Sequence, residues 1–376
     1  MEYIQSNIVL DDELFNIIYP FYIVNSVLLV RKYNIRDYNS IEHVNRINMM
    51  CAVFISCFIF CFYYIVMNYT HFGVIIYRTG YFFVYFCYAF VFASISVINL
   101  YHTDVSVRLL YIFNENNKYL YSKKYIRKLK FITWVSIGLV ITDCVSLVIF
   151  KLIYDIHWSF MRGFYVAMSG LLDVELIQVS IFILLLTYQT RIWNEKVENW
   201  KPMFMNDESI VTDNDLMLEE IYFNFKCIIE AWNLIMKSAE LFILFHYVTT
   251  FIQSIFYAEI LIVWSVKNFG KLEYIISHAV GMVLLLTKAF FVETGLCVAS
   301  ETFYEEIDRV HTNVILKLAE DLPSKKIWKN IYRILDEEFD KLHALNMFVV
   351  DAATLLHYCN LVTTYIIVLL QFAFLN

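Results

Sequence analysis

Proline, glycine and charge are scarce in this chain of 376 residues, which holds 3 Pro, 8 Gly and only 17% charged residues. Ordinary soluble domains carry about 25% charged residues. All three prolines, Pro20, Pro202 and Pro323, lie outside the longest apolar runs. Transporters often break their spanning helices with Gly and Pro and repeat the break in two halves. Because neither the breaks nor an internal repeat is present, a transporter is only a distant alternative.

Signatures of enzymes and of nucleic-acid binding are also missing. The sequence has no Gly-rich phosphate loop and no Gly-x-Ser-x-Gly, and its nine His include no pair at metal-ligand spacing within an apolar run. Lys and Arg form no basic stripe with stacking aromatics, and the net charge is -7. We therefore expect no enzyme activity, no cofactor, no metal and no nucleic-acid partner. No cleavable signal peptide is expected either, because Asp11, Asp12 and Glu13 precede the first apolar run without a basic segment.

The eight cysteines show no disulfide framework and no zinc-type spacing. Seven lie in apolar runs, and only Cys227 lies in a polar stretch. Those seven are Cys51, Cys57, Cys61, Cys87, Cys144, Cys297 and Cys359. We interpret them as small packing residues.

Apolar residues, by contrast, make up 60% of the chain and aromatic residues 18%. A globule of this size cannot hide so much apolar surface, so most of the chain should lie in lipid. The sequence predicts an all-α membrane protein with seven transmembrane helices. Their ranges are 47–67, 74–100, 131–153, 163–188, 241–266, 272–299 and 347–374. The earlier run 14–30 is interrupted by polar residues and is predicted to be an interfacial, re-entrant or docked helix.

The distribution of positive charge predicts a cytoplasmic N-terminus and an extracellular C-terminus. Of the 29 Lys and Arg, all but six fall on segments that this orientation places inside. The six exceptions are Arg78, Lys151, Arg162, Lys267, Lys271 and, within a span, Lys288. The glycosylation motif that starts at Asn68 then lies outside, close to the membrane.

Outer loops are predicted to be short and inner loops long, at 101–130, 189–240 and 300–346. The last contains an apolar stripe at helical spacing, which Pro323 precedes and Ser324 is placed to cap. Its residues are Ile327, Ile331, Leu335, Phe339, Leu342 and Leu345. The stripe is expected to pack against the chain's own loops or to form a subunit interface. The predicted regions are 1–46 (N-terminal), 47–300 (six-helix ligand-binding bundle), 301–346 (cytoplasmic anchor helix) and 347–376 (terminal helix).

Ionisable and polar residues inside spans are candidates for function, although each is equally explained by a hydrogen bond or ion pair that fixes helix packing. They are Asp143, Asp173, Glu175, Gln178, His246, Gln253, His278 and Lys288. Asp143 and Lys288 are predicted to pair. Aromatic residues are abundant in the outer half, where some form the interfacial belt and others are suited to a pocket for a small organic molecule. The candidate ligand-binding set is Tyr64, Tyr81, Tyr85, Asp143, Trp158, Tyr165, Asp173, Gln253, Tyr257 and Trp264.

The last span carries a short motif near its end. Thr364 and Tyr365 are followed by five apolar residues and then by Gln371 and Phe372. A Gln in such a span is costly unless it faces protein or water, so this helix is expected to hydrogen-bond a neighbour or to face a pore. The motif resembles the signature of insect gustatory receptors at all four fixed positions.

This resemblance implies a tetrameric ligand-gated cation channel in the plasma membrane, with the last helix of each subunit lining one pore. It implies a ligand pocket in the outer half of each bundle and a helical cytoplasmic anchor. Gln371 and Phe372 would form the gate, while Thr364 and Tyr365 would hold the helix against its neighbours. The implied partners are a small organic tastant, permeating cations, the lipid bilayer and related receptor subunits.

One position departs from the main sugar-receptor branch, which has an acidic residue where this chain has Ile366. The departure favours a receptor for bitter plant compounds, with the fructose-type branch and the insect odorant receptors as alternatives. A G-protein-coupled receptor is disfavoured by the expected cytoplasmic N-terminus. The Asp-Arg-Tyr and Asn-Pro-x-x-Tyr motifs of that class are also absent.

Overall fold

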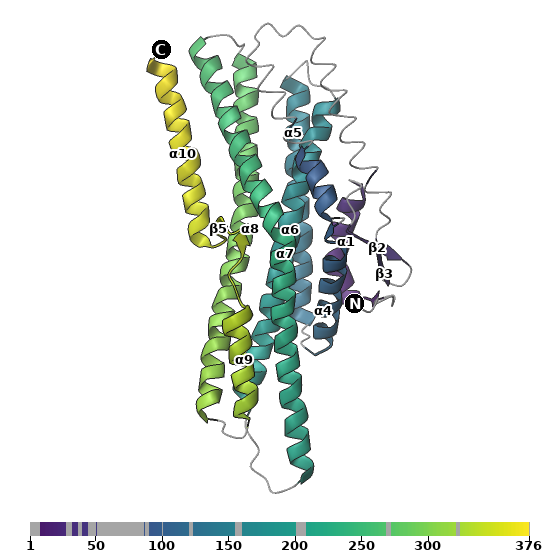
Figure 1. The fold of residues 1–376 in the computed structure, drawn as a ribbon. Coiled ribbons are helices and arrows are strands. Elements are labelled where there is room, and N and C mark those ends of the chain that lie inside the picture. Colours follow the sequence, from purple (N-terminus) through teal and green to yellow (C-terminus); the bar gives the residue numbers. More distant parts are fainter. Residues whose placement is uncertain are drawn as a thin grey trace.

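The computed structural model describes residues 8–27, 32–36, 40–43, 50, 86, 90–99, 101–119, 123–154, 160–200, 208–267, 272–320 and 324–375. Its architecture is a bundle of long helices, with the C-terminal helix set apart along one edge (Figure 1). The helices are α1 (Asp12–Val27), α4 (Thr103–Tyr119), α5 (Lys123–Tyr154), α6 (Phe160–Asn199), α7 (Glu208–Lys267), α8 (Leu272–Glu320), α9 (Lys325–Glu338) and α10 (Ala352–Leu375). Two small antiparallel sheets complete the described structure. They are β1 (Ile8–Val9), β3 (Ser40–His43) and β2 (Tyr33–Arg36), in that order, and the hairpin of β4 (His343–Ala344) and β5 (Phe348–Val349).

Among the described residues, five helices are long and apolar enough to cross a membrane. They are α5, α6, α7, α8 and α10, which correspond to the last five predicted spans. The segment Phe90–Asn99 and the first part of α4, bent by 58°, would together make a sixth. The predicted span 47–67, apart from Met50, and most of the span 74–100 lie outside the described residues.

Two of the predicted inner loops, 101–130 and 189–240, are largely helical in the structure. Residues 103–119 form α4, α6 continues to Asn199 and α7 already begins at Glu208. With 60 residues, α7 is about 90 Å long, roughly three times the thickness of a hydrocarbon core. Hydropathy reports only the part of a helix that lies in lipid, whereas the polar continuation is stabilised by packing against other helices.

The helix α6 is the central element of the bundle and packs against α5, α7 and α8. In its most apolar stretch 94% of the residues are buried inside the chain, compared with 28% for α5 and 11% for α10. The burial explains why α6 is apolar on every side, as a helix in a core must be. It also means that any polar side chain on α6 must find a partner within the protein.

The N-terminal apolar run 14–30 belongs to a docked helix, α1. One face of α1, formed by Leu14, Ile17, Ile18 and Phe21, is fully buried against the bundle. Its contacts are with α5 and α6. Of the three predicted arrangements, the structure therefore supports docking, which removes an apolar face that would otherwise need lipid.

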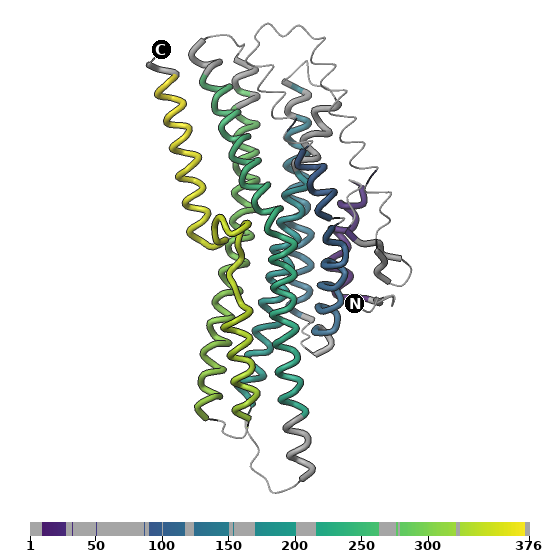
Figure 2. The backbone as a smooth tube through the Cα atoms, viewed as in Figure 1, coloured from purple at the N-terminus to yellow at the C-terminus, as the bar shows by residue number. Residues whose placement is uncertain are grey.

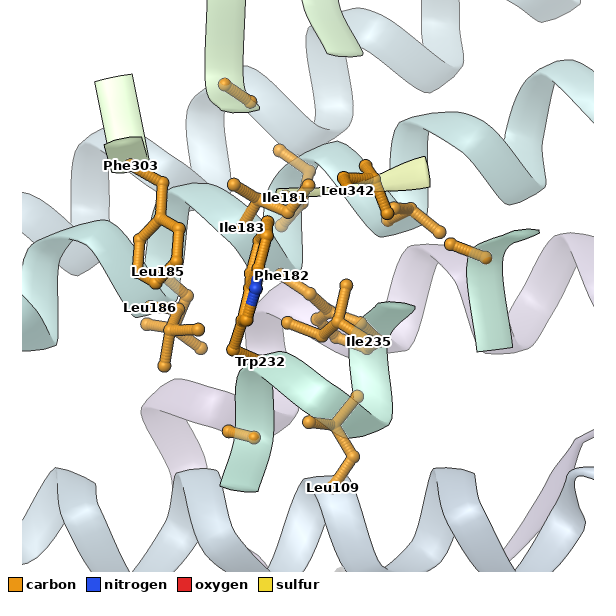
Figure 3. Close-up of a cluster of buried hydrophobic side chains, with 14 of the residues drawn as sticks. Leu109, Ile181, Phe182, Ile183, Leu185, Leu186, Trp232, Ile235, Phe303 and Leu342 are labelled. Carbon is orange, nitrogen blue, oxygen red and sulfur yellow. The ribbon is translucent and has the colours of Figure 1, made fainter. Parts of the chain in front are cut away.

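Trp232 of α7 is a fully buried member of the hydrophobic core that runs through the bundle. Its indole Nε1 donates to the carbonyl of Asp340 at 2.8 Å, and its ring lies 4.4 Å from that of Phe303. Figure 3 draws the side chains gathered around it from α4, α6, α8 and the segment after α9: Leu109, Ile181, Phe182, Ile183, Leu185, Leu186, Phe303 and Leu342. The bundle and the polar continuations of its helices thus share one core.

The apolar stripe of the anchor region is buried inside this chain rather than left for a second subunit. Ile331 and Leu335 on α9 are buried, and α9 packs against α7 and α8. The predicted stripe was too long, because α9 ends at Glu338 and Leu345 is 42% exposed in a turn with φ 49°. Ser324 occupies the N-cap position, but its side chain makes no capping hydrogen bond.

The β4–β5 hairpin connects the anchor region to α10 (Figure 2). Tyr304 of α8 clamps it: the hydroxyl accepts from the Leu342 amide at 2.9 Å and donates to the Val350 carbonyl at 3.1 Å. The helix α10 then starts at Ala352, five residues later than predicted. Asp351 caps it by accepting the amide of Thr354 at 2.9 Å.

Candidate functional site

The buried polar residues of α6 include Asp173, Glu175 and Gln178, which lie within two turns of each other. At about 100° per residue, Asp173 points to one side of the helix, while Glu175 and Gln178 point toward the opposite side. All three are at most 3% exposed. The sequence identified them as polar residues within a span, and the structure places them in two separate polar clusters.

The first, the Asp173 cluster, comprises Asp173, His246 of α7, and Lys288 and Glu293 of α8. The Lys288 Nζ lies 2.7 Å from Asp173 Oδ2, and His246 Nε2 lies 2.9 Å from Asp173 Oδ1. On its other side, His246 Nδ1 lies 3.3 Å from Glu293 Oε1. All four side chains are at most 8% exposed, so the cluster ties three helices together without help from water outside the bundle.

Charge balance in this cluster depends on His246. Both ring nitrogens face carboxylate oxygens, and only the imidazolium form has an N–H at each nitrogen. With His246 protonated, two carboxylates face two cations and the net charge is zero. A neutral imidazole would leave one buried negative charge without compensation, which is costly in a low-dielectric interior.

A small cavity adjoins the cluster. It has a volume of about 20 Å³ and is lined by Asp173, His246 and Lys288 together with Thr249, Thr250, Gln253, Val91, Leu172, Leu285 and Ala289. A volume of this size holds about one water molecule. Pockets for organic ligands are typically about 300–1,000 Å³, so the walls must separate before one fits here.

The second, the Glu175 cluster, lies on the opposite side of α6. Glu175 forms an ion pair with Lys32 and accepts hydrogen bonds from Asn99 at 3.3 Å and from Asn25 at 3.5 Å. Lys32 also donates to Gln178 at 3.3 Å. These contacts fix the end of α1 and the segment Phe90–Asn99 to the central helix.

Lys32 is the residue that sequence reasoning missed, because it follows α1 in a polar link. The available signal was a mismatch in charge. Apart from Arg78 and Lys151 near span ends, Lys288 is the one basic residue of the predicted spans, yet segment 163–188 alone contains two carboxylates. This mismatch pointed to a further cation from outside the spans, and Lys32, only 8% exposed, supplies it.

The predicted pairing of Asp143 with Lys288 was wrong, because Lys288 pairs with Asp173. Asp143 of α5 is half-buried and interacts with Lys288 only through longer-range electrostatics. Asp173 lies on the buried central helix α6, where a carboxylate without a cation is most costly.

Two other predicted ligand-binding residues lie near the cluster. Tyr257 is half-buried beside Phe256, and Gln253 lines the small cavity.

The remaining aromatic candidates were not brought into this site by the described structure. Four lie outside the described residues: Tyr64, Tyr81, Tyr85 and Trp158. Tyr165 and Trp264 lie on α6 and α7, and His278 lies on α8, but the side chains of these three are also outside the described set.

The terminal helix α10 is the most exposed span. Leu356, Ile367 and Phe372 are 72%, 49% and 65% exposed, whereas Val362 is buried against the bundle. The ring of Tyr365 contacts Phe251 of α7 edge-on, with centroids 5.2 Å apart. Thr364 and Gln371 are exposed. The fixed positions of the motif thus lie on a helix that is attached to the bundle along one narrow side.

Two apolar grooves follow the sides of α10. The larger, about 600 Å³, lies between α7, α10 and the β4–β5 hairpin. The other, the α8–α10 groove, is about 410 Å³ and shares Thr250 and Ala289 with the small cavity. Among the described residues there is no cluster suited to a metal ion, and the four described cysteines are free.

No protein-family model and no curated protein matches the sequence significantly. Solved structures do match. The insect olfactory receptor OR5 from Machilis hrabei is similar with a TM-score of 0.58 and 13% identity, over 96% of this chain and 100% of that one. The chain has the fold of an insect olfactory receptor. The structure of the same receptor in complex with eugenol is similar with a TM-score of 0.53 at the same identity and coverage.

This fold, together with the apolar helices, makes the chain a multi-pass membrane protein, and the predicted all-α membrane class is confirmed. At 13% identity, this similarity concerns the fold alone. It is equally compatible with the gustatory interpretation and with the odorant-receptor alternative. The orientation of the termini and the tetramer stay predictions.

Proposed function

We propose that this chain is a gustatory receptor of the plasma membrane, a ligand-gated non-selective cation channel opened by small organic tastants. The olfactory-receptor fold supports a chemoreceptor, and the motif that ends in Gln371 and Phe372 supports the gustatory branch. Ile366, at the position that is acidic in the main sugar-receptor branch, favours bitter plant compounds as ligands.

The exposure of α10 is the observation that carries the channel proposal. A span of which only 11% is buried in its own chain must be covered by lipid or by other subunits. Gln371 is exposed near its end, and an amide that faces hydrocarbon without a partner costs several kcal/mol. In a tetramer with four α10 helices around one pore, Gln371 faces water and permeating cations instead.

In this arrangement Phe372 closes the pore. Four rings at one level form a hydrophobic constriction that excludes water and therefore ions. The N-terminus is cytoplasmic and the C-terminus extracellular, as the distribution of Lys and Arg indicates. Tyr365 holds α10 to α7 through Phe251. The extended lower halves of α7 and α8, with α9, form the cytoplasmic anchor.

The ligand would bind next to the buried polar groups of the bundle. Asp173 and Gln253 line the small cavity, and Tyr257 interacts electrostatically with Lys288 next to it. A tastant that enters the bundle from the outer half would separate these walls and disturb the ion pairs of the Asp173 cluster. Because Glu293 belongs both to this cluster and to the groove beneath α10, such a disturbance would reach the terminal helix.

The test is whole-cell current from cells that express the chain alone. Phe372→Ala should raise the resting cation current several-fold, because a methyl group cannot close a dewetted constriction. Leu356→Ala is the matched control, since Leu356 is similarly exposed near the opposite end of α10 and should leave the resting current unchanged. Equal surface expression of the two variants with no added leak in Phe372→Ala would contradict the proposed gate.

The choice between gustatory and odorant-type receptors is decided by the ligand. Bitter plant compounds, sugars including fructose, and volatile odorants would be applied in turn to the same cells. Currents evoked by bitter compounds support the proposal, and currents evoked only by volatile compounds would replace it with the odorant-type alternative. Stoichiometric ion-coupled uptake without such currents would favour a transporter.

A further inference from the structure

The exposed side of α5 changes character along its length. Near the start of the helix, Lys124, Arg127 and Lys128 are exposed, and their spacing places them on one side. The same side continues with the exposed aromatic residues Phe131 and Trp134. Beyond these it is mostly aliphatic, with Val135, Leu139, Ile141, Val145 and Ile149 exposed. This set of residues, the α5 stripe, is thus cationic at one end and apolar along the rest.

The opposite side of α5 attaches the helix to the bundle. Ile126, Leu129 and Ile137 are buried, and α5 packs against α1, α6 and α8. Lys130 is half-buried on this side, and its Nζ donates to the side-chain oxygen of Asn16 on α1 at 3.1 Å. The stripe is therefore the side of α5 that the described part of the chain leaves uncovered.

The three cations of the stripe lack the acidic partners that other basic residues have. Elsewhere in the described structure basic side chains are paired, as Arg191 is with Glu306. No carboxylate among the described residues pairs with Lys124, Arg127 or Lys128. The sequence explains this difference, because residues 116–142 contain six Lys and Arg and no Asp or Glu, in a chain of net charge -7.

These cations also lie where positive charge is unfavourable for the helix. Lys124 and Lys128 are four residues apart, a spacing at which like charges repel and destabilise a helix. The helix dipole disfavours cations near the N-terminal end, and the first turn of α5 has no acidic residue. An anion bound among the three cations removes both penalties. A phosphate suits this place, because a guanidinium such as that of Arg127 can donate two parallel hydrogen bonds to it.

The apolar part of the stripe indicates what carries the phosphate. From Lys124 to Lys128 the helix rises by about 6 Å, which matches a headgroup layer of about 5–7 Å. Aromatic residues such as Trp134 are typical of the membrane interface that comes next. We propose that the α5 stripe binds an anionic phospholipid, whose phosphate contacts the three cations and whose acyl chains lie against the aliphatic residues. A soluble anion satisfies the charges but accounts for neither the aromatic residues nor the aliphatic surface beyond them.

The orientation indicated by the distribution of Lys and Arg puts this site in the cytoplasmic leaflet, which is the leaflet that carries anionic lipids. That placement rests on the proposed function, whereas the lipid contact itself does not. Lipid binding is measured without current. A failure of this site and a failure of the channel proposal are therefore distinguishable.

Trp134 provides a local readout, because bromine atoms on the acyl chains of a neighbouring lipid quench tryptophan fluorescence. Purified protein would be placed in phosphatidylcholine nanodiscs that contain a small, fixed fraction of brominated phosphatidylserine or of brominated phosphatidylcholine. Brominated phosphatidylserine should quench several-fold more strongly, because each cation near an anionic headgroup strengthens binding by roughly fivefold. Trp134→Phe should remove this difference, which would assign it to the stripe.

Two triple variants separate a specific site from a general effect of charge. Lys124→Gln combined with Arg127→Gln and Lys128→Gln should reduce quenching by brominated phosphatidylserine to the level of brominated phosphatidylcholine. The matched control removes three exposed lysines from α9, changes the net charge by the same amount and should keep the preference for phosphatidylserine. Its substitutions are Lys325→Gln, Lys326→Gln and Lys329→Gln.

Four outcomes overturn the proposal. Equal quenching of the wild type by the two brominated lipids would show that the stripe contacts lipid without selecting its charge. Loss of the preference in both triple variants would make it an effect of net charge. A preference that survives Trp134→Phe would place the anionic lipid elsewhere. No quenching of Trp134 by either lipid would show that protein, such as a second copy of the chain, covers the stripe.

Discussion

The pairing of Lys288 with Asp173 makes a quantitative prediction. Lys288→Met leaves Asp173 and Glu293 with one imidazolium between them and so creates a buried charge of −1. Breaking a buried ion pair by removing one partner costs about 3–5 kcal/mol. At about 2 °C per kcal/mol for a large chain, the Tm should fall by about 6–10 °C.

The double variant Asp173→Asn with Lys288→Met tests the pair itself. It removes one charge of each sign and leaves Glu293 balanced by His246. Its Tm, measured by thermal unfolding of the purified protein in detergent, should recover at least half of the loss seen in Lys288→Met. A double variant as unstable as the single one, or a single variant as stable as the wild type, would refute this account of the cluster.

Asp143→Asn is the matched control for the same experiment. Asp143 is half-buried and lies near Lys288 without forming an ion pair with it. Alone it should change the Tm by about 2 °C or less, within the range of ordinary surface substitutions. Combined with Lys288→Met it should restore clearly less stability than Asp173→Asn does. A larger recovery with Asp143→Asn would show that Lys288 pairs with Asp143 rather than with Asp173.

Three further predictions concern stability. Lys32→Met should lower the Tm by a similar amount, because Glu175 loses its cation, and Glu175→Gln in the same chain should recover part of it. Trp232→Phe keeps most of the packing but loses the hydrogen bond to Asp340, and calorimetry should show a loss of about 1 kcal/mol. Asp351→Ala should cost about 1 kcal/mol at neutral pH through the lost cap. Burial raises the pKa of Asp351, but hydrogen bonds from the first turn of α10 outweigh this effect and hold the pKa below 3.8. The difference in Tm between Asp351→Ala and the wild type should therefore be constant around neutral pH. It should shrink as the pH falls below 3.8, because the cap is lost when the carboxylate is protonated.

Hydropathy located the last five spans, because burial in lipid and burial in a helix core demand the same residues. It gave no account of the helical continuations of α6 and α7, whose polar residues are held by contacts such as that between Arg191 and Glu306, 2.6 Å apart. Nor did it separate α6 from α10. Both read as apolar spans, yet one is buried in its own chain and the other is exposed. That difference lies in three-dimensional contacts, which a single sequence does not encode locally.

The polar residues show the same limit at the level of the site. Sequence identified Asp173, His246, Gln253 and Lys288 because a polar or ionisable group in a span needs a partner. It did not identify the pairs, since Asp143 and Asp173 are equivalent candidates until the position of each helix is known. Lys32 was out of reach by hydropathy alone, because its burial results from the docking of α1.

The clamp at the β4–β5 hairpin constrains how α10 can move. Tyr304 holds both ends of the hairpin to α8, while only 11% of the apolar stretch of α10 is buried in the chain. A helix fixed at one end behaves as a rigid rod on a pivot. With a length of about 36 Å, a tilt of about 5° displaces its far end by about 3 Å and its base by almost nothing. Small rearrangements beside the hairpin are therefore amplified at Gln371 and Phe372. The distance of these two residues from the hairpin along α10 determines how far their side chains move.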